Sequence, residues 1–127
     1  MNNINFMEEN EYILEYQNFQ NEFKRTETSP DQAGELIMHL AGHYARYNMR
    51  YADKLRRFSA VMADLINSVD PQSGKSMTAS KAEILGSATP ECAEYQLAKV
   101  HINNLQEMIN AMKSLQKSLS VEYGNSQ

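Results

Sequence analysis

Cations and aromatic side chains alternate in the segment GHYARYNMRYADKLRRF, residues 42–58. It holds three tyrosines, one phenylalanine, four arginines and one lysine. Aromatic rings can stack on nucleobases and cations can follow a phosphate backbone, which is how many proteins bind single strands. A helix with a buried aromatic seam and solvated flanks has the same composition. The segment therefore has two interpretations, a nucleic-acid surface or a salt-bridged helix face.

The basic residues of this segment favour one face of a helix. Arg46, Arg50 and Lys54 recur every four residues, Arg57 continues the line, and Asp53 is the one acid among them. A solvated helix face usually mixes signs, so the row indicates an anionic partner. The Tyr47 ring lies beside this row and off the predicted apolar seam, so it could stack on a nucleobase. The predicted nucleic-acid-binding residues are Arg46, Tyr47, Arg50, Lys54, Arg56 and Arg57.

Two other interpretations of this face remain open. The bases could simply pair with carboxylates of the acidic N-terminal segment, or they could bind an acidic protein. Both would give the same row of charges, since each requires only cations on an exposed helix face. A mixed-sequence single-stranded oligonucleotide would separate them from nucleic-acid binding.

Other reactive residue types do not form a recognisable catalytic or metal site. Gly74–Ser76 reads GKS, but a phosphate-binding loop needs a glycine at position 69, where this chain has Val69, and a preceding strand. Glu35, His39 and His43 share a helix face, yet no comparable ligand group lies on the second long helix. Cys92 has no evident base partner. We therefore expect no enzyme activity, no cofactor and no metal site.

The charge of the chain is unevenly distributed. The 127 residues carry a net charge of −4, and residues 1–28 supply all of it, with six glutamates against Lys24 and Arg25. A basic patch on the neutral remainder can still bind a polyanion. The single cysteine indicates a reducing compartment, and no secretion signal or membrane span is recognised, so we expect a cytoplasmic protein.

Apolar periodicity predicts an all-α protein with two long antiparallel helices. A short acidic helix is expected at about residues 8–25, followed by Ser29 as N-cap and Pro30 at the first helical position of a helix over 31–69. Asn48 is predicted as a polar position within its apolar seam. The seam alternates steps of four and three residues through Ile37, Ala41, Tyr44, Asn48, Tyr51, Leu55, Phe58, Met62, Leu65 and Val69.

The second half of the chain predicts a linker and the returning helix. Residues 70–88 form a polar linker with a short helical turn at Lys81–Leu85, and a helix over 89–123 begins with Thr89 as N-cap and stops at Gly124. Residues 1–127 are expected to form a single helical domain. The first helix has more apolar stripe than one partner helix can cover, which predicts a homo-oligomer. The expected stripe of the second helix is Tyr95, Ala98, Ile102, Leu105, Ile109, Met112 and Leu119, broadened by Met108 and Leu115.

Over roughly residues 35–120 this pattern resembles the UvsY family of phage recombination mediators. The likeness lies in a long first helix whose basic cluster includes the step Lys54-Leu55-Arg56, a polar linker, and a final helix passing through INAMKS, Ile109–Ser114. The resemblance implies single-stranded DNA binding, with Lys54 and Arg56 in the basic step. It also implies a ring-like homo-oligomer and contacts with a recombinase and a single-strand-binding protein. The alternative is a helical protein–protein adaptor or phage assembly protein that binds no nucleic acid.

Overall fold

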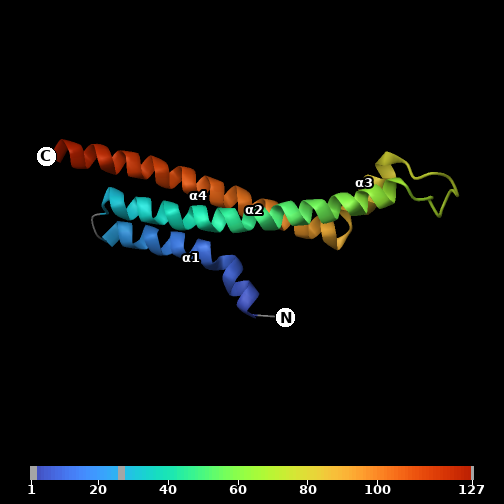
Figure 1. The fold of residues 1–127 in the computed structure, drawn as a ribbon, viewed down its shortest axis with the longest axis horizontal. Helices are drawn as coiled ribbons and strands as arrows, with labels where there is room; N and C mark the ends of the chain where they lie inside the picture. The colour runs from blue at the N-terminus through green and yellow to red at the C-terminus, as the bar shows by residue number, and fades with distance from the viewer. Residues whose placement is uncertain (1–2, 26–27, 127) are drawn as a thin grey trace. The chain divides into compact units, whose positions relative to one another are not determined.

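The computed structural model describes the backbone of residues 3–25 and 28–126, and the side chains of residues 11–23, 28–122 and 124. Over these residues the fold is all-α and contains no strand, only an isolated antiparallel bridge between Val69 and Ser76. The two long helices pack as the predicted antiparallel hairpin (Figure 1). The helices are α1 (Asn3–Arg25), α2 (Pro30–Ile66), α3 (Ala79–Ser87) and α4 (Pro90–Ser126).

The chain forms two compact units, to which α2 and α4 both contribute. Unit 1 consists of residues 1–45 and 103–127, and unit 2 of residues 46–102. In unit 1, α1 runs beside the first half of α2, and the second half of α4 completes the packing (Figure 1). Its largest fully buried side chains are one from each helix, Tyr12, Leu40 and Leu105. The single helical domain over residues 1–127 stays a prediction.

The predicted helix starts are confirmed by their cap hydrogen bonds. The Ser29 hydroxyl accepts from the Gln32 N–H at 3.2 Å, and the Gln32 side-chain oxygen accepts from the Ser29 N–H at 2.9 Å. This reciprocal pair is a capping box at the start of α2. The Thr89 hydroxyl accepts from the Cys92 N–H at 3.2 Å and caps α4. Because each cap uses residues three apart, the local sequence is enough to specify it.

The two long helices end within three residues of their predicted positions. α2 ends at Ile66 rather than Val69, since the Ser68 hydroxyl donates to the Leu65 carbonyl oxygen at 2.7 Å and the chain then turns away. Val69 is 63% exposed and does not continue the seam. α4 continues through Gly124 to Ser126. A glycine in a helix costs only about 1 kcal/mol relative to alanine, which is too little to stop it by itself.

The buried face of α2 lies one residue earlier than predicted in the first half of the helix. Predicted seam residues Ala41 and Asn48 are exposed, so Asn48 cannot fix the register of a buried seam. The buried and half-buried positions step by four residues twice in succession, from His43 to Tyr47 and from Tyr47 to Tyr51, where the predicted seam steps by four and then by three. From Tyr51 onward the two patterns agree at Phe58, Met62 and Leu65, but the predicted seam residue Leu55 is 37% exposed. The buried residues of α2 are Ala33, Leu36, Leu40, His43 and Tyr47, followed by half-buried Tyr51, Phe58, Met62 and Leu65.

The stripe of α4 agrees with the prediction. Five of its predicted members are buried, namely Ala98, Ile102, Leu105, Met112 and Leu119. The other four, Tyr95, Met108, Ile109 and Leu115, are half-buried. Its buried members include Ala98, Leu105, Met112 and Leu119, which repeat every seven residues as the heptad pattern predicts.

The linker is held together by Asp70 and is not a plain solvent loop. The buried Asp70 carboxylate accepts two hydrogen bonds from Lys81 Nζ, at 2.8 and 2.7 Å, and one from the Gln72 N–H at 2.9 Å. These bonds, that of Lys81 above all, hold the pKa of Asp70 below its usual value. Gly74 adopts φ = +70°, a conformation that glycine takes without strain.

Helix α3 is longer than the turn predicted for this region. Thr78 caps it by accepting from the Lys81 N–H at 3.2 Å. Gly86 packs directly on the Met62 side chain of α2, where a Cβ atom would find no room. This close contact positions α3 against the hairpin within unit 2, and it explains why a helix forms where the local sequence predicts only a turn.

Candidate nucleic-acid interface

The aromatic residues of the opening segment belong mostly to the core of unit 2. The Tyr51 ring lies 5.7 Å from the Tyr95 ring of α4, and the Phe58 ring stacks on the same tyrosine at 5.4 Å and 16°. Hydrogen bonding with Tyr95, and burial to a lesser degree, raise the pKa of the Tyr51 hydroxyl. These half-buried rings join α2 to α4, so the role that the structure shows for them is packing between the two helices.

Tyr47 is buried, which corrects its predicted position off the seam. Its side chain is only 3% exposed and its ring lies 5.0 Å from the His101 ring. The one-residue shift of the α2 seam places it on the core face. The guanidinium carbon of Arg50 lies over the Tyr47 ring, 5.0 Å from its centroid. Tyr47 can therefore position Arg50 through a cation–π contact, but it does not present a free face for a base.

Three of the predicted bases are engaged in ion pairs. Lys54 Nζ lies 3.1 Å from the Glu94 carboxylate of α4, and its side chain is 30% exposed. Asp53 lies 2.6 Å from the Arg56 guanidinium and 3.1 Å from that of Arg57. Among the side chains that the structure describes, the carboxylates that pair with these three bases are Glu94 of α4 and Asp53 of α2.

An exposed basic face of α2 is formed by Arg46, Arg50 and Arg57. These residues are spaced i, i+4 and i+11, and all three are exposed. Arg57 keeps 59% exposure while it pairs with Asp53. Exposed ion pairs contribute about 0–1 kcal/mol, so a phosphate group can compete with Asp53 for this guanidinium. Arg56 is 79% exposed, but it lies on a different side of the helix.

The two units carry opposite net charge. Unit 2 holds eight Lys and Arg residues and six Asp and Glu residues, so its net charge is +2. Unit 1 holds four bases and ten acids, so its net charge is −6, and together the units give the −4 of the chain. The candidate interface thus lies on the positive unit, which makes anion binding there more favourable than the charge of the whole chain indicates.

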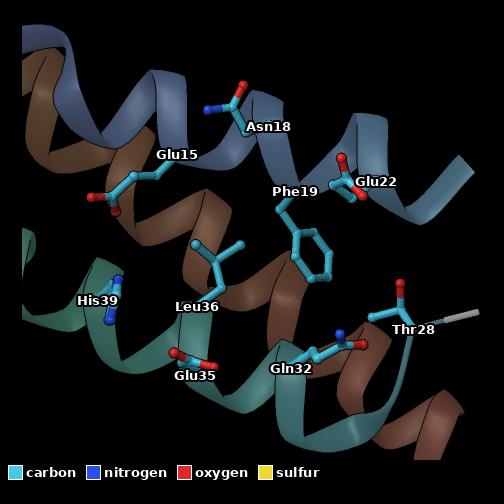
Figure 2. Close-up of a pocket in the computed structure, with 9 residues that line it drawn as sticks. All are labelled: Glu15, Asn18, Phe19, Glu22, Thr28, Gln32, Glu35, Leu36 and His39. Carbon is cyan, nitrogen blue, oxygen red and sulfur yellow. The ribbon is translucent and has the colours of Figure 1, made fainter. Parts of the chain in front are cut away.

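An acidic cavity in unit 1 was not foreseen from the sequence. It has a volume of about 400 Å³ and lies between α1 and α2, with the Phe19 ring directed into it (Figure 2). The carboxylates of α1 and α2 gather there only because the two helices dock, which no local pattern reveals. Its lining residues are Glu15, Asn18, Phe19, Glu22, Thr28, Gln32, Glu35, Leu36 and His39.

The two histidines that were predicted to share one helix face, His39 and His43, lie in different environments. His39 is exposed and lines the acidic cavity together with Glu35, whereas His43 is 5% exposed and lies 3.1 Å from Glu15. The three residues therefore do not converge on one point. The carboxylates nearest to His43 are Glu11 and Glu15 of α1.

The remaining motifs have structural roles in unit 2. Cys92 is buried in the first turn of α4. The GKS segment closes a turn in which the Gly74 N–H donates to the Asp70 carbonyl oxygen and the Asp70 N–H donates to that of Lys75, both at 2.8 Å. In the described part of the chain, none of the helices combines the length and apolar character needed to cross a bilayer.

Comparison with known proteins does not add a family to these observations. No family model matches the chain, and no curated protein or solved structure matches it.

Proposed function

We propose that the chain is a non-catalytic, homo-oligomeric protein that binds single-stranded DNA through phosphate contacts on α2. The observation that carries the proposal is the exposed row of Arg46, Arg50 and Arg57 on the positively charged unit. Guanidinium groups bind phosphate by paired hydrogen bonds, and their planes can also stack on bases. Arg50, supported from below by the Tyr47 ring, fits the second role.

The resemblance to phage recombination mediators supports a role for this single-stranded DNA binding in recombination. A mediator of this type would help to load a recombinase on single strands that a single-strand-binding protein covers. The basic step consists of Lys54 and Arg56. The Lys54 side chain is 30% exposed and pairs with Glu94, whereas the Arg56 side chain is 79% exposed. We therefore assign the main phosphate contacts to Arg46, Arg50 and Arg57, with Arg56 and Lys54 as peripheral cations.

Anisotropy of a labelled, mixed-sequence single strand tests DNA binding directly. Affinity should fall with salt at a slope of about −0.7 per phosphate contact, hence roughly −2 for three contacts. The variant Arg46→Ala/Arg50→Ala should weaken binding and flatten this slope. Lys113→Ala/Lys117→Ala is the matched control, because it removes the same charge from two exposed side chains of unit 1.

The outcome also decides between DNA binding and the adaptor function. Absence of binding at tens of micromolar protein and about 50 mM salt would reject the DNA interface, since electrostatic affinity is highest at low salt. A specific observation favours the adaptor in that case. Unit 2 exposes large apolar side chains that a protein partner could cover, including Met49 at 75%, Leu97 at 52% and Val100 at 52%.

A further inference from the structure

Two carboxylates of α1 converge on a buried imidazole of α2 in unit 1. Glu15 Oε2 lies 3.1 Å from His43 Nε2, and one ligand atom from each of Glu11, Glu15 and His43 lies within 4.8 Å of the other two. His43 is buried, Glu15 is half-buried and Glu11 is exposed. The cluster thus has a protected imidazole on its inner side and a carboxylate open to solvent on its outer side.

A simple histidine–glutamate hydrogen bond does not account for Glu11. One carboxylate is enough to accept from an imidazole N–H, and Glu15 already holds the 3.1 Å position. Glu11 and Glu15 are four residues apart on one helix face, where like charges repel each other. A divalent cation between the two carboxylates and the imidazole would cancel this repulsion and would become the largest local charge.

We propose that Glu11, Glu15 and His43 form a binding site for a divalent transition-metal ion of the zinc or manganese type. An imidazole nitrogen with two carboxylate oxygens suits these ions, whereas magnesium and calcium prefer oxygen ligands alone. At bond lengths of about 2.0–2.2 Å, two ligands of one ion lie roughly 2.8–3.6 Å apart, from right-angle to tetrahedral geometry. The observed distance of 3.1 Å between His43 Nε2 and Glu15 Oε2 lies in this range.

The surroundings of the cluster fit such a site. Tyr12 is fully buried and its ring lies 6.2 Å from the His43 ring. The Tyr12 hydroxyl hydrogen-bonds to Asn104 of α4, so the inner wall of the cluster is fixed by all three helices of unit 1. An ion bound there would fasten α1 to α2, because its ligands come from both helices.

The acidic cavity provides access for the ion and for water. Glu15 belongs to both the cluster and the cavity, in which His39 and Glu35 of α2 also lie (Figure 2). Three protein ligands leave at least one coordination position open, which water can fill from the cavity side. Carboxylates around the cavity would also raise the local concentration of cations.

Titration of the untagged full chain with Co²⁺ and then Zn²⁺ tests the site. We expect one ion per chain, a visible Co²⁺ absorption band that Zn²⁺ abolishes, and a higher thermal midpoint with metal present. His43→Gln and Glu15→Gln should weaken binding at least about tenfold, since even the loss of a residue that only supports a ligand costs 10–100-fold.

Two further variants keep the test decisive if His43→Gln disturbs the packing of α1. Glu11→Gln changes an exposed side chain, so it should leave the helical circular dichroism intact and still weaken metal binding. His39→Gln changes the neighbouring histidine of the same helix and should leave the affinity unchanged. Both helicity and metal affinity are measured for every variant.

The proposal is overturned by either of two results. One is that the wild-type chain shows no Co²⁺ band and no thermal shift with Zn²⁺. The other is that the variants place the ion elsewhere. In that case Glu11→Gln and His43→Gln bind Zn²⁺ as well as the wild type, or His39→Gln is the one variant that loses binding. DNA binding by Arg46, Arg50 and Arg57 does not enter this test, so the two proposals fail separately.

Discussion

Burial decides what a single aromatic side chain can do at the basic face of α2. Tyr47 has the residue type and the neighbours of a base-stacking residue, but its ring packs on His101 and beneath Arg50. In the proposed DNA interface its contribution would therefore be indirect, through the position of the Arg50 guanidinium. Its larger contribution is to the stability of unit 2.

Replacing Tyr47 with alanine should destabilise the protein by about 3–5 kcal/mol, the usual cost of removing a buried aromatic ring. Urea unfolding followed by circular dichroism measures this change. Tyr47→Phe keeps the ring and the contact with Arg50, so it should lose much less. A variant Tyr47→Ala with normal stability and a specific loss of DNA affinity would contradict the buried position.

Asp70 gives the linker a pH-dependent stability. Its folded pKa is lowered by Lys81 and Gln72, whereas an unfolded aspartate titrates at about 3.9. A carboxyl whose pKa is lower in the folded state stabilises the protein above the unfolded value. This stabilisation is lost as the pH falls from about 4 toward the folded pKa.

The free energy of unfolding should therefore differ most between wild type and Asp70→Asn at pH 5–7, and the difference should shrink below about pH 4. Urea unfolding at pH 7, 5 and 3 provides the measurement. Asp64→Asn serves as the control, because it removes an exposed carboxylate near the end of α2, six residues before Asp70. If both variants lost the same free energy of unfolding at pH 7, the hydrogen bonds of Asp70 would stabilise the protein no more than an exposed carboxylate does.

At the scale of the elements, the register of α2 can be tested by one pair of adjacent substitutions. Leu40 is fully buried, whereas Ala41, a member of the predicted seam, is exposed. An unpaired carboxylate in the core costs several kcal/mol, so Leu40→Asp should unfold unit 1 and Ala41→Asp should leave it folded. Circular dichroism and thermal melts distinguish the two. Unfolding by Ala41→Asp alone would restore the register predicted from the heptads.

The elements that could be predicted from the sequence are those fixed by local chemistry. Ser29 with Gln32 and Thr89 with Cys92 mark helix starts through hydrogen bonds within one turn, and the α4 stripe keeps its predicted seven-residue spacing. The register of α2 and the length of α3 depend instead on contacts between distant segments, such as Gly86 on Met62. A pattern read along one helix cannot contain that information.

The same distinction applies to the candidate sites. The exposed bases Arg46, Arg50 and Arg57 are visible in the sequence because they lie on one helix. The burial of Tyr47 required the true register. The cluster of Glu15 with His43 required the docking of α1 on α2, since the two residues are 28 positions apart. Spacing on a single helix therefore grouped His43 with the wrong partners.

At the scale of the whole molecule, charge and exposed surface point to different tasks for the two units. Unit 1 carries −6 and contains the acidic cavity, while unit 2 carries +2 and the exposed arginines. A DNA strand should therefore be attracted to unit 2 and repelled by unit 1. This separation lets an acidic protein bind a polyanion through one part of its surface.

Exposed apolar side chains of α4 motivate the proposed association with further copies of the chain. Leu97 and Val100 are each 52% exposed, and apolar surface that is open to water often marks a contact with another protein. In a ring-like homo-oligomer of the kind that the family resemblance implies, each subunit would make two contacts.

Light scattering on the wild-type protein at tens of micromolar should accordingly give a mass that is a multiple of 14.5 kDa. Leu97→Ser/Val100→Ser removes two exposed apolar side chains of α4 and should shift the mass toward the monomer, while Val121→Ser, also exposed, is the control. Linked sites raise the effective concentration of the arginine face, so the monomeric variant should bind single strands more weakly although Arg46, Arg50 and Arg57 are intact. A wild-type monomer would contradict the oligomer. A monomeric variant with unchanged DNA affinity would show that binding does not depend on assembly.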